Sequence, residues 1–430
     1  MIRPPHRRRS ATIPVALAIL ALVSGCSAPP SPTLQPSAGP SAAAGVARLV
    51  DRIATSHPDP WFGTGESAFR AAAAALAERL PTLAPEGQIV EVMRLVAMIG
   101  ADGRNGHMLA LPDAPPGSHR LPVGFHLFAD GLHVVEADTA RAELVGARVD
   151  RIGGMPVADA LDRLRPLVNR DNPHTVDWLL PLLLESPTIL AGAGVVADPA
   201  RVDLGVVLPD GRAETVTVEP ARTEPYADLL EAFVSLRLPP RDGLTWLSDQ
   251  ETELWTEPMA EADALYVQYN TIWESSERYL VAVRRELRRS AAERLILDLR
   301  LNPGGENPNY PPLLAALAAL EDDGIDLVVL IGRATFSAAT AFATEVREAT
   351  GARFVGEPSG GSPTTYASVR PMRLDELALP MVVWVPSQAS SVGPPQATTL
   401  EPELVVELRA DDYFAGRDPV LDAALALPRR

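Results

Sequence analysis

The chain has 430 residues, of which 47% are hydrophobic and 22% charged, so it is long enough for two or three domains with cores of their own. Its formal net charge is −17, and without the four arginines of residues 1–25 it carries 34 basic and 55 acidic residues, a net charge of −21. This balance argues against nucleic acid as a partner and against adhesion of the protein surface to anionic lipid. A single cysteine excludes a disulfide framework.

Residues 1–25 have the pattern of a signal peptide. Four arginines precede an apolar run at residues 11–23, which is too short for a stable membrane span. Cys26 follows the sequence Val-Ser-Gly, which resembles a bacterial lipoprotein signal, whose cysteine becomes the lipidated first residue; an ordinary secretory signal with an incidental cysteine is the alternative. Residues 26–44 are rich in Pro, Ser, Ala and Gly and predict a flexible tether. We therefore expect an extracytoplasmic protein of the cell envelope, anchored to the membrane by a lipid, or secreted if the anchor is absent.

Residues 45–115 are predicted to form a helical cap domain. Apolar residues recur at three- and four-residue spacing over residues 47–53, 68–80 and 87–99, as in amphipathic helices. A glycine-rich loop follows and ends in His107. Such a loop can form a turn or a site, and on the sequence alone a turn is the simpler interpretation.

Residues 116–222 predict a β-rich domain. Short strands are expected at residues 121–128, 131–137 and 147–152, and two more around a hairpin turn at 209–211. Helices are expected at 157–167 and, as an insertion, at 175–190. Residues 223–262, rich in Pro, Asp and Glu, are predicted to be an irregular linker.

Residues 263–430 alternate apolar strands with helices, which predicts a parallel sheet with its site at the carboxyl ends of the strands. Ser337 opens the helix after the strand at 326–331, where a hydroxyl stands clear of the sheet and the helix amino terminus stabilises negative charge. Gly304 and Gly305 allow close backbone approach, so the N–H groups of Gly305 and Ala338 could form an oxyanion hole. On these residues alone, an N-capping serine and a tight turn are the simpler interpretation.

Three stretches carry a resemblance to a known family: LILDLRLNPGG, GRATFSAATAFATEV and ARFVGEPSGGSPTTY. Together they resemble the S41 peptidases, the tail-specific or C-terminal processing proteases. The resemblance implies a catalytic β-α sandwich of the ClpP/crotonase-like type, with Ser337 as the nucleophile and Gly305 in the oxyanion hole. It also implies that residues 116–222 are a degenerate PDZ-like domain, with a β-rich spacer that binds no ligand as the alternative.

The same resemblance bears on the general base. The best-known branch uses a lysine, but Ser362 occupies that place and the chain contains no lysine. Another branch carries Asp-Gly-His-Thr where this chain has Asn-Gly-His-Met, which implies that His107 is the base, with Asn105 in place of the usual aspartate. A neutral imidazole can accept the serine proton near pH 7. Glu401 or Glu403 could orient the histidine by analogy.

Further substrate contacts are expected from the loops around Ser337, namely from Gly304, Ser362 and Asn270. Asn270 ends the strand at 264–270, where it could bind substrate or only cap the strand end. We expect a lipid-anchored serine endopeptidase or C-terminal processing peptidase that acts on peptides or proteins, without metal or cofactor. The alternative is a non-catalytic S41-like lipoprotein that binds peptide tails or assists cell-envelope assembly. The sequence does not indicate an oligomeric state.

Overall fold

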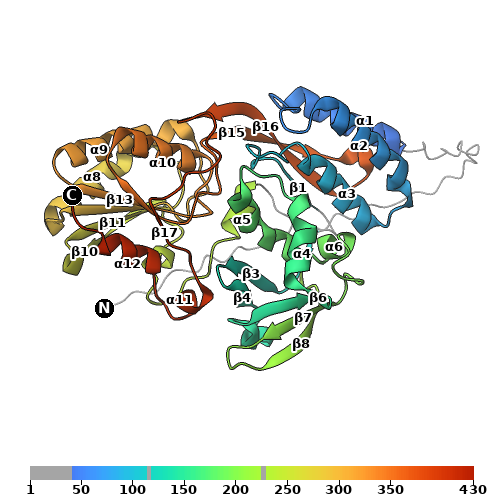
Figure 1. Cartoon of the computed structure of the whole chain (residues 1–430), viewed down its shortest axis with the longest axis horizontal. Coiled ribbons are helices and arrows are strands. Elements are labelled where there is room, and N and C mark those ends of the chain that lie inside the picture. Colours follow the sequence, from blue (N-terminus) through green and yellow to red (C-terminus); the bar gives the residue numbers. More distant parts are fainter. Residues whose placement is uncertain (1–40, 114–117, 224–228) are drawn as a thin grey trace, which may run out of the picture. The chain divides into compact units, whose positions relative to one another are not determined.

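The structure is a computed structural model that describes residues 41–113, 118–223 and 229–430 (Figure 1). The predicted signal peptide, Cys26 and most of the predicted tether lie outside the described residues. Within the described ranges, no helix combines the length and the apolar character that a membrane span requires.

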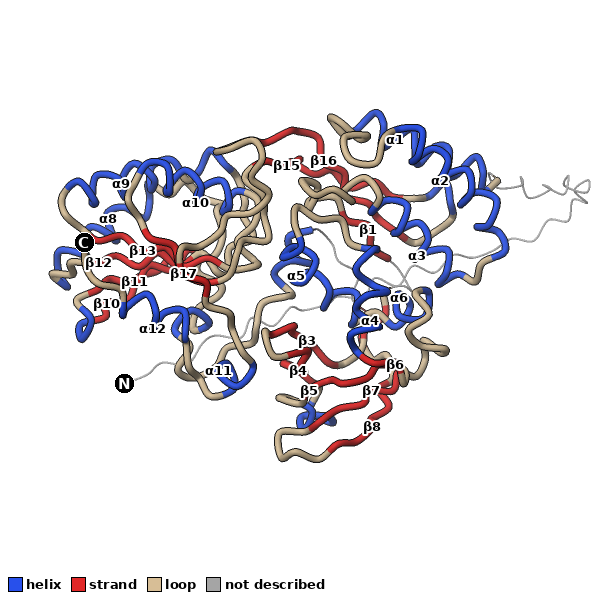
Figure 2. The backbone as a smooth tube through the Cα atoms, in the orientation of Figure 1, coloured by secondary structure: helices blue, strands red, loops and turns tan. Residues whose placement is uncertain are grey.

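The predicted cap helices are present: α1 (Ala42–Ser56), α2 (Glu66–Arg79) and α3 (Pro85–Ala97). They pack on a three-stranded antiparallel sheet, as Figure 2 shows, and two of its strands come from the far end of the chain. The strand order is β1 (Leu109–Pro112), β16 (Met381–Ser391) and β15 (Thr364–Arg373). Leu109 pairs with Trp384. The cap is therefore completed by a hairpin of the C-terminal part of the chain.

A second sheet is built from strands within residues 123–218. Its strand order is β3 (Val123–Phe128), β4 (Gly131–Ala137), β5 (Arg148–Ile152), β7 (Val202–Val207) and β8 (Ala213–Val218), and β6 (Met155–Pro156) pairs with β5. A separate pair joins β2 (His119–Arg120) to β9 (Arg222–Thr223). The strands agree with the predicted ones, and the PDZ-like character of this part stays a prediction.

The helices of this part are α4 (Val157–Leu164), α5 (Pro173–Leu184) and α6 (Pro187–Gly192). The single helix predicted at 175–190 is wrong, because the chain breaks it before Pro187. Ser186 accepts a hydrogen bond from the Ile189 N–H at 3.3 Å and starts a new helix there.

The central sheet has the strand order β10 (Leu254–Met259), β11 (Ala264–Tyr269), β12 (Arg294–Asp298), β13 (Asp326–Ile331), β14 (Arg353–Gly356) and β17 (Leu404–Val405). Only β10 is antiparallel to its neighbour. β10 lies in the stretch of residues 223–262 that was predicted to be irregular, and so does a helix at residues 229–234, so that prediction is wrong for both ranges. The α/β class is confirmed.

Helices cover both faces of the central sheet (Figure 1). One face packs against α8 (Glu277–Ser290), α9 (Pro311–Asp322) and α10 (Ala338–Ala349), and the other against α11 (Ala410–Phe414) and α12 (Pro419–Ala426). Alternate residues of each strand enter the two cores: Leu265 and Leu295 lie in the first, and Tyr266 and Ile296 in the second. This double burial explains why the strands are continuous apolar runs. The remaining helix, α7 (Leu229–Val234), lies between the second and the central sheet in sequence.

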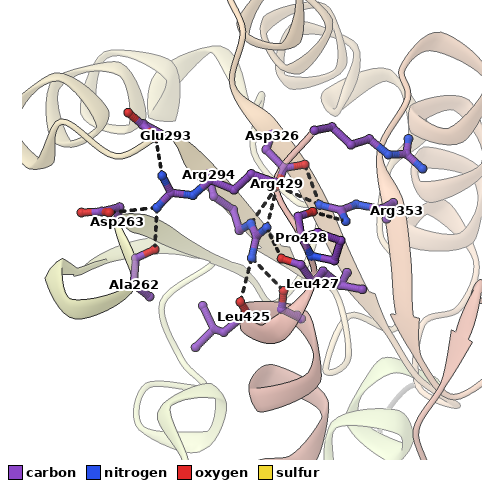
Figure 3. A network of polar contacts seen from close by, with 12 residues as sticks. Ala262, Asp263, Glu293, Arg294, Asp326, Arg353, Leu425, Leu427, Pro428 and Arg429 are labelled. Carbon is purple, nitrogen blue, oxygen red and sulfur yellow. Dashed lines mark hydrogen bonds and ion pairs between the residues drawn. The ribbon is translucent and has the colours of Figure 1, made fainter.

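An arginine cluster ties the C-terminal residues to the central sheet (Figure 3). Arg294 and Arg353 both contact the buried carboxylate of Asp326 at 2.8 Å. Arg294 also donates to the Leu427 carbonyl at 2.7 Å, and Arg353 to the Pro428 carbonyl at 2.7 Å. These contacts hold residues 425–428 at the amino-terminal ends of strands β12 to β14.

Candidate active site

Ser337 lies in the turn between β13 and α10, with φ of +52° and ψ of −126°. Residues other than glycine rarely adopt such a φ, which costs roughly 1–3 kcal/mol when the surroundings enforce it. The turn is held by Thr335, whose Oγ1 accepts from the Gly332 N–H at 3.0 Å and donates to the Leu299 carbonyl at 2.9 Å. The Ser337 side chain accepts no capping hydrogen bond. The N-cap interpretation is therefore wrong. The backbone of Ser337 is strained, and its hydroxyl is left for another role.

The two glycines of the loop after β12 lie against this turn. A Cβ atom at Gly304 would stand 2.6 Å from the Ser337 Cβ, so only glycine fits there. The Gly304 N–H donates to Asn302 Oδ1 at 2.9 Å. By contrast, neither the Gly305 N–H nor the Ala338 N–H at the start of α10 has an acceptor among the described residues. These are the two N–H groups predicted for the oxyanion hole, and they remain available for it.

Arg300 lies between the end of β12 and the glycine loop. Its guanidinium contacts Asp298 at 2.6 Å and Asp418, the N-cap of α12, at 2.8 Å. It also stacks over Trp246, with 4.5 Å from Cζ to the ring centre. The bidentate contact with Asp418 is buried, so it joins the end of β12 to the start of α12 more firmly than a surface ion pair would.

His107 lies in the loop between α3 and β1, with 5% of its surface exposed. Its ring packs on Phe336, the residue before Ser337, with 4.4 Å between ring centres. Neither Nδ1 nor Nε2 has a hydrogen-bond partner among the described residues. Burial lowers the pKa of His107 from 6.5 to about 4, so the imidazole is neutral at pH 7.

His107 and Ser337 line one cavity of about 750 Å³, together with Gly305 and the exposed Trp273. No hydrogen bond joins the two side chains in this structure. Residues of β15 and of the second half of β16 also line it: Ala367, Ser368, Val369, Arg370, Ser387, Gln388, Ala389 and Ser390. The structure therefore brings together the predicted nucleophile, base and oxyanion donors, which lie far apart in the sequence.

None of the three predicted substrate-binding residues lines this cavity, so the structure corrects their assignment. Gly304 lies against the turn at Ser337. Asn270 is buried and its Nδ2 donates to the carbonyls of Asp249 and Thr252, both at 2.9 Å. Ser362 is also buried, and its Oγ lies 2.7 Å from the Thr364 carbonyl and 3.0 Å from the Ala397 carbonyl, one of which accepts its proton. These polar groups are used to hold strand ends and loops, as in the strand-cap alternative for Asn270.

Glu401 does not reach the cavity either. Its side chain is exposed, and its carbonyl accepts a hydrogen bond from Arg347 at 2.6 Å. Glu403 accepts from the Phe354 N–H and lies 3.7 Å from Arg347. Neither carboxylate is placed to orient His107, because that of Glu401 is exposed and that of Glu403 is engaged at the edge of the central sheet.

Asn105, in place of the aspartate expected from the resemblance, shapes the histidine loop. It is fully buried, and its Oδ1 lies 3.1 Å from His57 Nε2. His57 Nδ1 accepts from the Asp59 N–H at 3.1 Å, so Nε2 carries the proton and donates to Asn105. Burial lowers the pKa of His57, which keeps it in this neutral form.

Sequence analysis missed Asp171, a fully buried carboxylate beside the histidine loop. It accepts hydrogen bonds from the Gly106 N–H at 2.8 Å, the Thr365 hydroxyl at 2.6 Å and the Ser362 N–H at 3.1 Å. Burial raises the pKa of Asp171 to about 6, although these three bonds act in the opposite direction. Its sequence surroundings show only the start of a helix, at Asn172, so no local signal pointed to it.

No cluster of His, Cys, Asp and Glu side chains suited to a metal ion occurs among the described residues. The cavity lining contains a hydroxyl and an imidazole, together with the charged side chains of Glu306 and Arg370.

No protein-family model and no curated protein matches the chain. Among solved structures, mature CPAF complexed with lactacystin matches with a TM-score of 0.60 and 14% identity, over 90% of this chain and 97% of that one. A second structure of mature CPAF matches with a TM-score of 0.58 and 13% identity, over 90% and 96%. The photosystem II D1 C-terminal processing protease is more distant, with a TM-score of 0.41 and 14% identity over 89% and 98%. At such identities a likeness shows the fold alone. The chain has the fold of the S41 peptidases, as the sequence resemblance implied.

Proposed function

We propose that this chain is a serine peptidase that hydrolyses peptide bonds through Ser337. The observation that carries the proposal is the meeting, in one cavity, of a strained serine without a capping bond and a histidine with two unpaired ring nitrogens. Buried polar atoms are nearly always paired, and unpaired ones call for a functional explanation. Proton transfer from the serine supplies that explanation, and it agrees with the fold.

The mechanism follows from these groups. Ser337 Oγ attacks the substrate carbonyl carbon while His107 accepts the hydroxyl proton. The carbonyl oxygen becomes an oxyanion and accepts hydrogen bonds from the N–H groups of Gly305 and Ala338. When the C–N bond breaks, His107 returns its proton to the leaving amine, and an acyl ester remains on Ser337. Water, deprotonated by His107, then attacks the ester carbon; the bond from that carbon to Oγ breaks, His107 returns the proton to Oγ, and the peptide leaves with a new carboxyl end.

The lowered pKa of His107 suits this cycle in one respect and opposes it in another. With a pKa of about 4 the imidazole is neutral at pH 7, as a base must be. Such a base holds a proton weakly, but the oxyanion that forms beside it favours the imidazolium. We propose that this negative charge raises the histidine pKa in the transition state, when it is needed.

We propose a peptide or protein segment as the substrate. A cavity of about 750 Å³ is within the range of ligand sites, and its wall is formed by two strands, β15 and β16. Such a wall offers main-chain groups to an extended peptide. Both endopeptidase activity and processing of C-terminal ends agree with this site, and no cofactor is needed.

We also propose that the mature protein begins at Cys26 and is held at the outer face of a bacterial membrane by a lipid on that residue. The support is the order of arginines, apolar run and cysteine in residues 1–26. The net charge of −21 of the mature chain argues against adhesion of its surface to anionic lipid, which leaves the lipid as the predicted anchor.

The proposed function is tested by casein hydrolysis with four variants. Ser337→Ala, His107→Ala and the double variant should each lower the rate by about 10⁴-fold or more, because residues that act as a unit are not additive. Ser248→Ala replaces an exposed serine that does not line the cavity; it is the matched control and should hydrolyse casein normally. Unchanged hydrolysis by Ser337→Ala would refute the proposal. A wild-type protein that binds but never cleaves peptides would instead be a non-catalytic relative.

A further inference from the structure

Residues 169–175, which lead into α5, lie between the two loops that carry the proposed catalytic residues. The first is the loop of residues 100–107, which ends in His107. The second is the loop of residues 359–365, which packs on the turn at Ser337. Contacts with both loops make this segment a bridge between base and nucleophile.

The segment holds the backbone just before His107. The Arg104 N–H donates to the Asp171 carbonyl at 3.1 Å, and the Asn105 N–H to the Arg170 carbonyl at 3.0 Å. The Gly106 N–H donates to Asp171 Oδ1 at 2.8 Å. Three consecutive N–H groups therefore end on two residues of the segment, which fixes where the following histidine lies.

The same carboxylate holds the second loop. Asp171 Oδ2 accepts from the Ser362 N–H at 3.1 Å, and Oδ1 accepts from the Thr365 hydroxyl at 2.6 Å. Gly361, beside these residues, lies directly on the nucleophile turn, since a Cβ there would be 3.1 Å from the Ser337 nitrogen. One buried side chain thus bonds the backbone next to the base and the loop that packs on the nucleophile.

We infer that Asp171 is a positioning residue for the Ser337–His107 pair, whose carboxylate sets the distance and angle between hydroxyl and imidazole. This inference rests on the proposed function. It concerns a residue that touches neither substrate nor reacting atoms and acts through the two loops it joins.

The burial of Asp171 supports a functional role. All three donors lower its pKa, yet burial raises the pKa to about 6, so the hydrogen bonds do not fully compensate the lost hydration. A carboxylate kept in an unfavourable place is more often found at functional sites than in structural cores. Catalysis gives a reason for it, because a misplacement of about 1 Å can lower a rate by about 10²-fold.

Replacement by asparagine tests this geometry with little change of volume. The amide has one acceptor oxygen and one NH₂ donor, whereas all three neighbours of Asp171 are donors. Whichever way the amide turns, at least one donor loses its acceptor and faces another donor. The two loops should then shift apart while the fold remains.

The experiment compares Asp171→Asn with wild type and with Asp102→Asn, which removes an exposed carboxylate from the same histidine loop. The readouts are kcat and KM for a peptide substrate, the labelling rate of Ser337 by a fluorophosphonate probe, and the folded fraction by circular dichroism at the assay temperature. Asp171→Asn should lower kcat and the labelling rate by roughly 10- to 100-fold, with KM within about twofold of wild type. Asp102→Asn should match wild type in every readout.

A second pair of variants decides the matter if Asp171→Asn does not fold. Thr365→Val removes one of the three donors, and Thr365→Ser retains the hydroxyl, so the serine variant should keep several-fold more kcat than the valine variant. Equal kcat in the two Thr365 variants, or wild-type kcat in folded Asp171→Asn, would overturn the inference. A rise of KM at constant kcat would also overturn it, because that pattern indicates a substrate contact. If wild type shows no labelling of Ser337 at all, the proposed function fails instead, which is a separate outcome.

Discussion

The Gly106 N–H, one residue before His107, donates a 2.8 Å hydrogen bond to the fully buried carboxylate of Asp171. This contact links a loop of the N-terminal cap to a carboxylate that also holds the loop lying on Ser337. The candidate site is thus assembled by contacts between segments distant in sequence, and its properties depend on backbone strain, close glycine contacts and buried titratable groups. Each of these features can be measured.

Strain at Ser337 predicts an unusual order of stabilities. Ser337→Gly should be more stable than Ser337→Ala by about 1 kcal/mol, because glycine adopts a φ of +52° without strain. Ser337→Ala should lie within about 0.5 kcal/mol of wild type, since no capping hydrogen bond is lost. Urea denaturation measures both differences. A loss of about 1 kcal/mol in the alanine variant would instead indicate a capping serine.

The contact between Gly304 and Ser337 predicts a severe effect of a single methyl group. Gly304→Ala would place a Cβ 2.6 Å from the Ser337 Cβ, so the oxyanion loop must move away from the nucleophile and the rate should fall at least about 10²-fold. Gly324→Ala is the matched control, because Gly324 also has a positive φ but a methyl group added to it would meet no atom within 4 Å. It should lose roughly 1 kcal/mol of stability and no activity. Equal activities of the two variants would contradict this account.

Asp171 and His107 should have opposite effects on stability between pH 7 and pH 5. The pKa of Asp171 is raised to about 6, so its contribution to stability is present at low pH and lost as the pH rises through 6. The pKa of His107 is lowered to about 4, so the unfolded state takes the proton first and acidification below 6.5 destabilises the folded state. Each effect amounts to about 1–2 kcal/mol over this range, and the two largely cancel in wild type.

Replacing either residue should reveal the effect of the other on the pH dependence of stability. Asp171→Asn should lose more stability than wild type on going from pH 7 to pH 5, and His107→Ala should lose less, each by about 1–2 kcal/mol. Urea denaturation at the two pH values gives these numbers. If both variants respond to pH as wild type does, the two groups are not buried as the structure shows.

The lipid anchor predicts where the protein is found in the cell. Cys26→Ser should move the protein from the membrane fraction to the soluble extracytoplasmic fraction, because a cysteine thiol is needed for the lipid. Fractionation followed by immunoblotting measures the change. Membrane attachment that persists in the variant would rule out Cys26 as the anchor.

The sequence predicted those parts of the fold that depend on local patterns. We find β12, β13 and the helix after Ser337 within the apolar and helical stretches of the sequence. Burial on both faces of a strand and the periodicity of a helix both depend on residues that are close in sequence. The pairing of β1 with β16 could not be predicted in this way. Leu109 and Trp384 pair in the sheet although they lie far apart in the sequence. Such long-range pairing leaves no periodic signal in either segment.

For the site, the resemblance supplied the identities of Ser337 and His107, while the geometry came only from the structure. Nothing local distinguishes a strained serine from an N-cap, since both stand at the start of a helix. Glu401 was chosen by analogy in a chain rich in carboxylates, and its side chain proved to be exposed at the sheet edge. Asp171 was missed because its partners lie on two loops far from it in sequence.

The central claim is that Ser337 is an activated nucleophile, and site-resolved labelling with a fluorophosphonate tests it most directly. The intact protein is treated with the probe, digested and analysed by mass spectrometry, with Ser337→Ala and His107→Ala treated in parallel. The account predicts one adduct on Ser337, none in Ser337→Ala and at least about 10²-fold slower labelling in His107→Ala. Absence of the adduct in wild type, or its appearance on another cavity serine such as Ser390, would contradict it.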